Sequence, residues 1–256
     1  MAFQTASPCR SSVNNQTGGR AWRRGMRCPI RPAMDEMEQS RGRLAEVRGR
    51  IAAAAKASGR SPAAIELIAV SKTQTGAAIS RLIAAGQRSF GENRVQEAQS
   101  KWPDLRAAHP DVRLHLIGQL QSNKAVEAVR LFDIIHSVDR PSLLAALAKA
   151  MVETGRQPDC FVQVNIGDEP QKGGCGITAL PDLLAEAARL GVPIAGLMCV
   201  PPDVIEAAPF FALLAKLSRD HGTAGLSMGM SADFDTAVML GATCVRVGTA
   251  LFGDRQ

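Results

Sequence analysis

Eight short apolar runs, each separated from the next by a segment with helical periodicity, constrain the fold of this chain more than any other feature. The runs cover residues 67–70, 88–90, 114–117, 133–136, 161–166, 194–200, 225–228 and 243–247. Helical patterns fill the intervals, as in residues 76–85, 123–131, 142–153, 180–190, 204–219 and 233–240. Strands that alternate with helices form a parallel sheet, and eight such units close into a (β/α)8 barrel. The pattern therefore predicts a single α/β TIM barrel, with an open doubly wound sheet as the alternative.

Residues 1–34 differ in composition from the rest of the chain. They contain six arginines but no lysine and no acid, and they are rich in Ser, Asn, Gln and Gly. A segment with so few apolar residues cannot pack a core, so we predict a disordered basic extension at 1–34 and the barrel at 35–256.

Two explanations of this extension remain open. Its composition fits an organellar transit peptide. It also fits upstream sequence included by a start codon placed too early, because Met34 and Met37 stand where the first helical pattern begins. The second explanation is favoured, since the extension lacks a clear amphipathic face.

Charge and rare residue types exclude several classes of protein. The net charge of +6 belongs to the extension, because the 24 lysines and arginines outside it balance the 24 acids. We therefore expect no nucleic-acid partner for the barrel. No run of about 18 apolar residues occurs, so no membrane span is expected. The six cysteines form no C-x-x-C pair and the four histidines lack metal-ligand spacing, which predicts a reducing, cytoplasmic setting and no metal site.

Three segments at predicted strand ends carry candidate chemistry. Lys72 closes the first apolar run, the SMGMS segment at 227–231 follows the seventh, and the RVGT segment at 246–249 closes the eighth. TIM barrels place active residues at the C-terminal ends of strands and phosphate sites after strands seven and eight. Strand eight neighbours strand one in a closed barrel, so an amine and a phosphate-binding loop are expected to meet.

The two glycine-bearing segments have the residue types of a phosphate cradle. Gly229 and Gly248 allow the backbone to approach a phosphate closely, and Ser227, Ser231 and Thr249 offer hydroxyl donors. Ser231 also stands where an N-cap would direct a helix N-terminus at the anion. An amine beside a phosphate cradle suits pyridoxal 5′-phosphate (PLP), whose aldehyde condenses with lysine. A phosphate-binding barrel without a cofactor is the plainer alternative.

Seven blocks, in order over residues 34–253, resemble the signature of the PLP homeostasis protein family, also called the YggS/PROSC family. They read LIAVSKTQ, FGENRVQEAQSK, LHLIGQLQSNKA, IHSVDR, VQVNIGDEPQKGGCGI, GLMCVPP and LSMGMSADFDTAVMLGATCVRVGTALFG. The resemblance implies a single-domain barrel related to the barrel half of alanine racemase, with PLP held as an internal aldimine.

The resemblance also assigns residues to the cofactor. Lys72 would carry PLP, Asn93 and Met198 would line its ring, and Arg246 would face the pyridine nitrogen. The phosphate would be held by Ser227, Gly229, Met230, Ser231, Gly248 and Thr249. A guanidinium cannot accept a proton from that nitrogen, so Arg246 would weaken PLP as an electron sink. The alternative for Arg246 is a simple ion pair with an acid on a helix.

Two departures bear on catalysis. Arg94 stands where many relatives have tyrosine, which puts a peripheral contact in doubt. The chain contains no tyrosine at all, whereas the related racemases use a tyrosine from a second domain as the opposing base, and only three residues follow Gly253. A two-base mechanism would need a substitute such as His115 or Cys199.

We therefore predict a PLP carrier or buffer for intracellular PLP homeostasis, without robust catalysis and without an assigned catalytic residue. The alternative is an amino-acid racemase-like or aldolase-type enzyme that uses Lys72. A cytoplasmic monomer is expected, with PLP-dependent apoenzymes as possible recipients. The loop at 168–174, which carries Lys172, is either a partner or second-amine site or simply a mobile loop.

Overall fold

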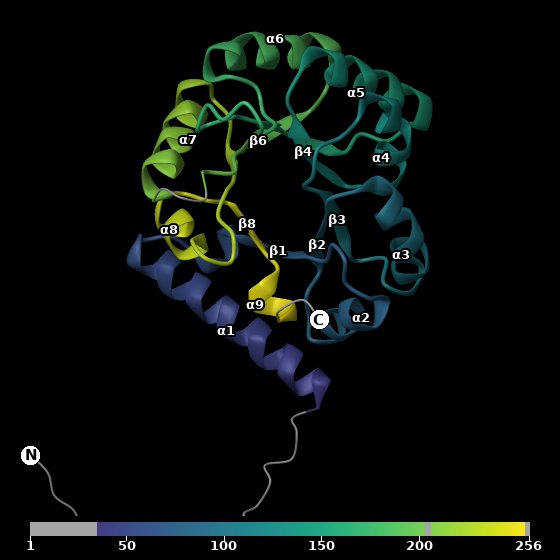
Figure 1. Cartoon of the computed structure of the whole chain (residues 1–256), viewed down its shortest axis with the longest axis vertical. Helices are drawn as coiled ribbons and strands as arrows, with labels where there is room; N and C mark the ends of the chain where they lie inside the picture. Colours follow the sequence, from purple (N-terminus) through teal and green to yellow (C-terminus); the bar gives the residue numbers. More distant parts are fainter. Residues whose placement is uncertain (1–34, 203–205, 254–256) are drawn as a thin grey trace, which may run out of the picture. The chain divides into compact units, whose positions relative to one another are not determined.

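A closed barrel of eight parallel strands forms the centre of the computed structural model, which describes residues 35–202 and 206–253. Each strand pairs with the next, and β1 pairs with β8 to close the ring (Figure 1). The strands are β1 (Glu66–Val70), β2 (Ser89–Glu92), β3 (Arg113–Leu116), β4 (Ile134–Val138), β5 (Asp159–Gln163), β6 (Ile194–Met198), β7 (Gly225–Ser227) and β8 (Cys244–Val247). The predicted (β/α)8 barrel is confirmed, and the open sheet is wrong.

Helices surround the strands on the outside (Figure 1). They are α1 (Glu36–Ala57), α2 (Gly76–Ala84), α3 (Val95–Ala108), α4 (Ala125–Leu131), α5 (Pro141–Thr154), α6 (Leu180–Leu190), α7 (Ala208–Asp220), α8 (Phe234–Met239) and α9 (Thr249–Phe252). Short 3₁₀ turns precede β1, α4 and α6 at Pro62–Ala64, Ser122–Lys124 and Ile177–Ala179. Helix α1 lies against α2, α8 and α9, and it covers the region where the barrel closes.

The sequence pattern predicted most of these helices but not α3 or α9. Helix α3 contains Pro103 in its interior, a residue that normally breaks a helix. Burial of Val95, Ala98 and Trp102 against the barrel compensates for the lost backbone hydrogen bond. Helix α9 has only four residues, too few to show a period. The predicted segment 204–219 begins outside the described residues, and α7 begins at Ala208.

Alternate residues of each strand point to opposite sides of the barrel wall, because the side-chain period of a strand is two. One set packs outward against the helices in the main core. The other set fills the inside of the barrel with a separate buried cluster of Ile68, Ile134, Phe161, Met198 and Cys244. The apolar part of the interior is therefore small, and polar side chains occupy much of the remaining space.

Three predictions from the sequence concern the extension at 1–34, membrane spans and metal sites. The extension at 1–34 falls outside the described residues. Within residues 35–202 and 206–253, no helix combines the length and the apolar character that a membrane crossing requires. The same residues contain no group of three or more His, Cys, Asp or Glu arranged to hold a metal ion.

Strands β6 and β7 come unusually close at a pair of glycines. A Cβ atom built on Gly196 would lie 2.1 Å from the carbonyl oxygen of Gly225, a distance that no real contact shows. Because the obstructing atom belongs to a paired strand, the clash cannot be relieved by turning a side chain. Glycine at position 196 therefore sets the spacing of two strands that lead to the C-terminal end of the barrel.

We predict that Gly196→Ala destabilises the protein by about 1–3 kcal/mol, the usual cost of overpacking. Gly49→Ala is the matched control, because Gly49 lies exposed inside α1 and a Cβ added there would meet no atom within 4 Å. Alanine there should stabilise α1 by up to about 1 kcal/mol through helix propensity. Urea unfolding of both variants measures the difference. Equal midpoints would show that β6 and β7 adjust freely.

Candidate functional site

The ten predicted site residues all lie at the C-terminal ends of five strands. They lie in the last two residues of a strand or in the segment after it: β1 (Lys72), β2 (Asn93), β6 (Met198), β7 (Ser227, Gly229, Met230 and Ser231) and β8 (Arg246, Gly248 and Thr249). The β1–β8 pairing brings the first and last of these strand ends together. Since Ala69 pairs with Val247, Gly248 lies beside Val70, and a Cβ added to Gly248 would lie 3.5 Å from the Val70 side chain. The amine-bearing and glycine-bearing segments therefore meet at one edge of the barrel.

The sequence predicted that Lys72 ends the first strand, and this prediction is wrong. Strand β1 ends at Val70, and Lys72 lies two residues later in a turn closed by the bond from the Gln74 N–H to the Ser71 carbonyl. Thr73 has a φ of 61°, so the turn holds a non-glycine residue in the left-handed region. Lys72 is half-buried, and its ammonium has no hydrogen bond or ion pair with any described residue. The turn after β1 thus carries an amine that has no partner within residues 35–202 and 206–253.

A buried ion pair holds this turn against α3. Glu92 ends β2 and is fully buried, and its Oε1 accepts from Ser71 Oγ at 2.7 Å and from the Trp102 indole at 3.0 Å. Lys101 Nζ lies 2.9 Å from the same Oε1 and donates to the Ser71 carbonyl at 2.9 Å. The residue before Lys72 is therefore fixed through both its side chain and its backbone.

Glu97 extends this network to the residue after Lys72. Its Oε1 accepts from Lys101 at 2.8 Å and from the Thr73 N–H at 2.5 Å. These contacts lower the pKa of Glu97, although burial acts in the opposite direction. Both neighbours of Lys72 are thus anchored to α3, while the lysine itself is left unbonded.

The loop after β7 has the close packing expected of a glycine-dependent turn. Gly229 has a φ of 92°, and a Cβ on it would lie 2.5 Å from the Cβ of Ala237. The Met230 N–H donates to Asp233 Oδ1 at 2.6 Å, and the N–H groups of Asp233 and Phe234 donate back to the Met230 carbonyl. This loop is held by its own backbone and by one aspartate.

The expectation that Ser231 is the N-cap of the next helix is wrong. Helix α8 begins at Phe234, and Asp233 occupies the N-cap position. Asp233 takes that place because its carboxylate closes the turn with Met230. Ser231 Oγ instead accepts from the Gly248 N–H at 3.3 Å, which links the loop after β7 to the end of β8.

The donors of this cradle divide into two groups. The N–H groups of Met230 and Gly248 already donate to Asp233 and Ser231. The N–H groups of Gly229 and Ser231 donate to no acceptor within the described residues. Thr249 begins α9, so its N–H has no partner inside the helix. The arrangement offers backbone donors of the kind that bind phosphate oxygens.

Arg246 lies inside the barrel and is almost completely buried. Its Nη1 donates to Ser227 Oγ at 2.7 Å, and its Nη2 donates to the Cys199 carbonyl at 2.8 Å. Burial lowers the pKa of the guanidinium from its usual value. The alternative for this residue, an ion pair with an acid on a helix, is absent from the part of the chain that the structure describes. Arg246 is therefore a buried cation held by neutral oxygens.

Asn93 and Met198 stand on either side of the barrel mouth. The Asn93 backbone packs so closely on Gly118 that a Cβ there would lie 2.3 Å from the Asn93 oxygen. Met198 ends β6 and packs in the buried cluster inside the barrel. Arg94, the departure noted in the sequence, is exposed and lines a cavity of about 290 Å³.

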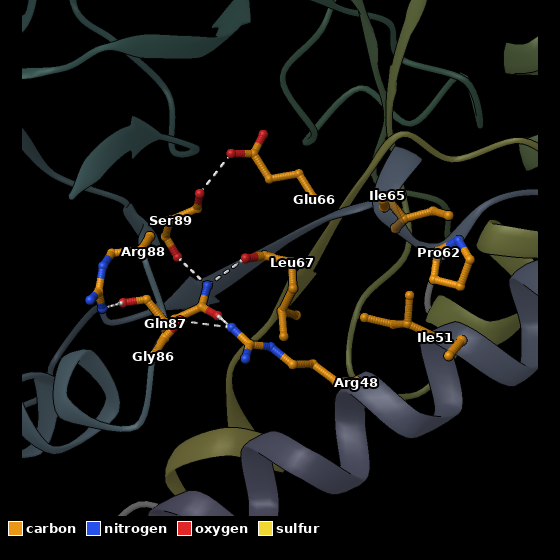
Figure 2. A pocket seen from close by; sticks show the side chains of 12 residues that line it. Arg48, Ile51, Pro62, Ile65, Glu66, Leu67, Gly86, Gln87, Arg88 and Ser89 are labelled. Atoms are coloured by element: carbon orange, nitrogen blue, oxygen red, sulfur yellow. Dashed lines mark hydrogen bonds between the residues drawn. The ribbon is translucent and has the colours of Figure 1, made fainter. Parts of the chain in front are cut away.

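Two further features lie away from this cradle. Lys172 pairs with Glu169 at 2.7 Å and donates to the Pro201 carbonyl at 2.8 Å, so its ammonium is engaged. A cavity of about 540 Å³ lies at the opposite end of the barrel, at the starts of β1 and β2 (Figure 2).

Sequence reasoning missed Glu92, Lys101 and His136. Glu92 and Lys101 both occur in the block FGENRVQEAQSK, where an acid at the end of an apolar run is the available signal. Nothing in the sequence pairs Lys101 with it, because the two meet only when α3 folds back. His136 is one of the four histidines that lack metal-ligand spacing, yet its Nδ1 lies 2.9 Å from Ser227 Oγ.

The donor set fits an aldehyde cofactor with a phosphate tail. Lys72 supplies an amine without a competing partner among the described residues, the β7 and β8 loops supply backbone N–H groups, and Arg246 supplies a fixed cation. Gly229, where an added Cβ would clash with Ala237, lies in the loop after β7. Which residues contact a ligand stays a prediction.

Comparison with known proteins finds relatives over most of the chain. Residues 43–256 match the family model of the alanine racemase N-terminal domain. The pyridoxal phosphate homeostasis protein of Pseudomonas aeruginosa is 41% identical over 220 residues, which cover 83% of this chain and 94% of that protein. The protein of the same name from Aquifex aeolicus is 36% identical over 224 residues, covering 84% of this chain and 97% of that protein.

Solved structures agree with these relatives. PipY of Synechococcus elongatus, solved with PLP bound, is 40% identical with a TM-score of 0.73, and the match covers 84% of this chain and all of PipY. Alanine racemase from Bartonella henselae is 15% identical with a TM-score of 0.66, covering 85% of this chain and 59% of the racemase. The second likeness concerns the fold alone.

We predict that Lys101→Met lowers the free energy of unfolding by about 3–5 kcal/mol, because it leaves the Glu92 carboxylate buried without its cation. Lys149→Met is the matched control, since Lys149 is exposed on α5 and should change stability by less than about 0.5 kcal/mol. Urea unfolding followed by circular dichroism gives both values. If both variants unfold at the same urea concentration, the ion pair does not stabilise the Lys72 turn.

Proposed function

Because the chain belongs to the family of the pyridoxal phosphate homeostasis proteins, we propose that it binds PLP at the C-terminal end of its barrel and serves in PLP homeostasis. One relative, PipY, was solved with PLP bound. The residues proposed to hold the cofactor here are those at the ends of β1, β2, β6, β7 and β8.

One observation supports this proposal above all others. The amine of Lys72 has no partner among the described residues, although both neighbouring residues are fixed by Glu92, Lys101 and Glu97. Lys72 can therefore condense with the aldehyde of PLP, with loss of water, while the β7 and β8 loops bind the phosphate.

Arg246 is proposed to keep the cofactor a weak electron sink. When bound, PLP supplies an aldehyde and a conjugated ring that can accept electrons. A guanidinium beside the ring nitrogen donates a hydrogen bond but cannot accept a proton. Arg246 is held in place by Ser227 and the Cys199 carbonyl, so it keeps a fixed orientation. This favours holding PLP over catalysing reactions with it.

The candidate substitutes for a second base do not favour a racemase. Burial raises the pKa of Cys199 to about 12, so its thiol stays protonated at neutral pH. His115 belongs to β3 and is hydrogen-bonded to His136 inside the barrel, close to Glu66 at the start of β1. Neither group combines basicity with a position at the C-terminal end. We therefore propose a carrier or buffer rather than a racemase.

The compartment, the oligomeric state and the partners of the protein are also proposals. We propose that the protein acts in the cytoplasm as a monomer and exchanges PLP with PLP-dependent apoenzymes. The neutral charge balance of residues 35–256 is the argument against a nucleic-acid partner. Sedimentation of the purified protein measures the oligomeric state.

The decisive experiment is covalent capture of PLP. Added PLP should give the purified protein a visible absorption band, and borohydride should fix the label on the peptide that contains Lys72. Lys72→Ala should show neither the band nor the label, because the amine held in that position is then missing. Mass spectrometry of the digested protein identifies the labelled peptide.

Lys149→Ala serves as the matched control and should keep both the band and the label. A wild-type protein that takes up no PLP would overturn the proposal. A label that persists in Lys72→Ala would move the site to another lysine.

A further inference from the structure

A line of polar side chains, buried except at Glu66, crosses the inside of the barrel. Arg246 Nη1 donates to Ser227 Oγ at 2.7 Å, Ser227 Oγ lies 2.9 Å from His136 Nδ1, and His136 Nε2 lies 3.0 Å from His115 Nδ1. His115 Nε2 then faces Glu66 Oε1 at 3.5 Å. Arg246 is close to the C-terminal end of β8, whereas Glu66 begins β1. The line therefore connects the candidate site to the opposite end of the barrel.

Arg246 gives this line a direction. A guanidinium can only donate, so Ser227 Oγ must accept from it. If the Ser227 hydroxyl donates to His136 Nδ1, then His136 carries its hydrogen on Nε2 and donates to His115 Nδ1. His115 then carries its own hydrogen on Nε2, directed at Glu66. With both histidines neutral, every donor from Arg246 onward points toward the Glu66 end.

One added proton reverses the direction of the hydrogen bonds between His115, His136 and Ser227. If His115 carries hydrogens on both nitrogens, its Nδ1 donates to His136 Nε2. His136 must then carry its hydrogen on Nδ1 and donate to Ser227 Oγ. Ser227 now accepts from both Arg246 and His136, so its own hydroxyl hydrogen is free to point at another acceptor. The change adds one proton and switches the tautomer of His136.

The surrounding charges place the added proton on His115 and not on His136. Burial, followed by the positive charges of His115, Arg246 and Arg113, lowers the pKa of His136 well below its usual value. Phe161 stacks on the His136 ring at a centroid distance of 4.6 Å and adds no charge. Among the described acids, Glu66 is the one that faces the histidines, and it lies beside His115.

Two further ionisable groups, Asp233 and Cys199, lie near the Arg246 end of the line. Burial lowers the pKa of Arg246, and Asp233, in the loop after β7, is one of the groups that act in the opposite direction. The Cys199 thiol beside Arg246 stays neutral, because burial raises its pKa to about 12. Neither group forms a hydrogen bond to His136 or His115. The acid that can balance a protonated histidine is therefore Glu66.

Glu66 remains a carboxylate throughout. Burial alone would raise its pKa, but hydrogen bonding and charge from His115, together with Ser89 and Arg113, lower the pKa to about 2. Arg113 Nη1 lies 3.2 Å from Glu66 Oε1, and the Cys244 thiol lies 3.8 Å from Oε2. Burial raises the pKa of Cys244 to about 12, so this thiol stays neutral. Glu66 is thus a permanent counter-charge for a protonated His115.

Glu66 also reaches solvent. Together with Ser89, Arg48 and Arg88 it lines the cavity of about 540 Å³ at the starts of β1 and β2. Figure 2 shows the Glu66 carboxylate beside Ser89, whose hydroxyl donates to it at 2.6 Å. The inner part of the line, in contrast, is fully buried at His115, His136 and Ser227.

We propose that His115 is a proton site that controls, through His136, whether the Ser227 hydroxyl is available to a bound anion at the C-terminal end of the barrel. The proposal rests on the proposed function, because Ser227 is assigned to the phosphate of PLP. His115 and His136 are positioning residues, since they act through Ser227. The proton moves by short steps: Ser227 Oγ gains it from the C-terminal end of the barrel, the original hydroxyl hydrogen passes to His136 Nδ1, and the His136 Nε2 hydrogen passes to His115 Nδ1.

The sign of the pH dependence follows from linkage. An anion that accepts the Ser227 hydrogen stabilises the state in which His115 is protonated. Anion binding therefore takes up as much as one proton, and affinity rises as the pH falls, by at most about tenfold per pH unit. Without this coupling, the affinity contributed by Ser227 would not depend on His115.

The free protein provides the first test, and it needs no variant. With ¹⁵N-labelled histidine, NMR distinguishes which ring nitrogen of each histidine carries hydrogen. At high pH we expect both His115 and His136 to carry it on Nε2. As His115 gains its proton, His136 should switch to Nδ1 in the same titration. A His136 tautomer that does not follow the charge of His115 would overturn the relay.

Calorimetry provides the second test. The probe is pyridoxine 5′-phosphate, which lacks the aldehyde and cannot react with Lys72. At about pH 8 its phosphate is already doubly ionised. Titration in two buffers with different heats of ionisation measures proton uptake, which should be larger in the wild type than in a variant without the His115 imidazole. His115→Gln is that variant, because glutamine hydrogen-bonds but does not take a proton. Any proton exchange by the ligand itself is the same for both proteins.

His109→Gln is the matched control, because His109 follows α3 as its C-cap, on the outside of the barrel, and the substitution should leave proton uptake unchanged. Equal proton uptake in wild type and His115→Gln would overturn the relay while leaving PLP binding intact. Failure of the proposed function is a different result, namely no visible band and no label on Lys72 with PLP itself. If His115→Gln does not fold, the NMR titration of the wild type decides the matter alone.

Discussion

The parallel pairing of β1 with β8 joins two segments from opposite ends of the described chain. Four residue pairs, from Glu66 with Cys244 to Ala69 with Val247, fix the register of this closure. A shift by one residue would turn Arg246 from the barrel interior toward the helices, because the side-chain period of a strand is two. The same register sets Gly248 beside Val70. The candidate amine, the phosphate cradle and the buried cation all depend on this one contact.

The interior that this closure creates contains buried polar side chains, among them Arg246, His115, His136 and Ser227. Among the described residues, the apolar side chains inside the barrel form one small cluster, and Arg246 forms no ion pair with an acid. Its charge is instead stabilised by the oriented oxygens of Ser227 and the Cys199 carbonyl. A buried cation without such support would carry a large desolvation cost. Ser227 and the Cys199 carbonyl thus supply the direct hydrogen bonds that hold Arg246 inside the barrel.

Predictions from the sequence were right where a strand or helix has a visible hydrophobic pattern of its own. All eight strands were predicted within a few residues, because short apolar runs bounded by turns are visible in the chain itself. It failed where a distant residue decides the local conformation. Lys72 lies beyond the strand because Ser71 is held by Glu92 and Lys101. Ser231 is not a helix cap because Asp233 closes the preceding turn. Helix α3 continues through Pro103 because its buried face packs on the barrel.

The sequence by itself determined the barrel, the C-terminal location of its chemistry and the family, because strand period, turn residues and ordered blocks are properties of the chain. Only the tertiary structure decided which groups are partnered. The pairing of Glu92 with Lys101 and the line from Arg246 to Glu66 join residues from different strands and helices. No sequence period records such contacts, since they arise from the closure of the sheet. The physical reason is that hydrogen bonds and buried charges depend on distance in space, whereas patterns in a chain record only distance along it.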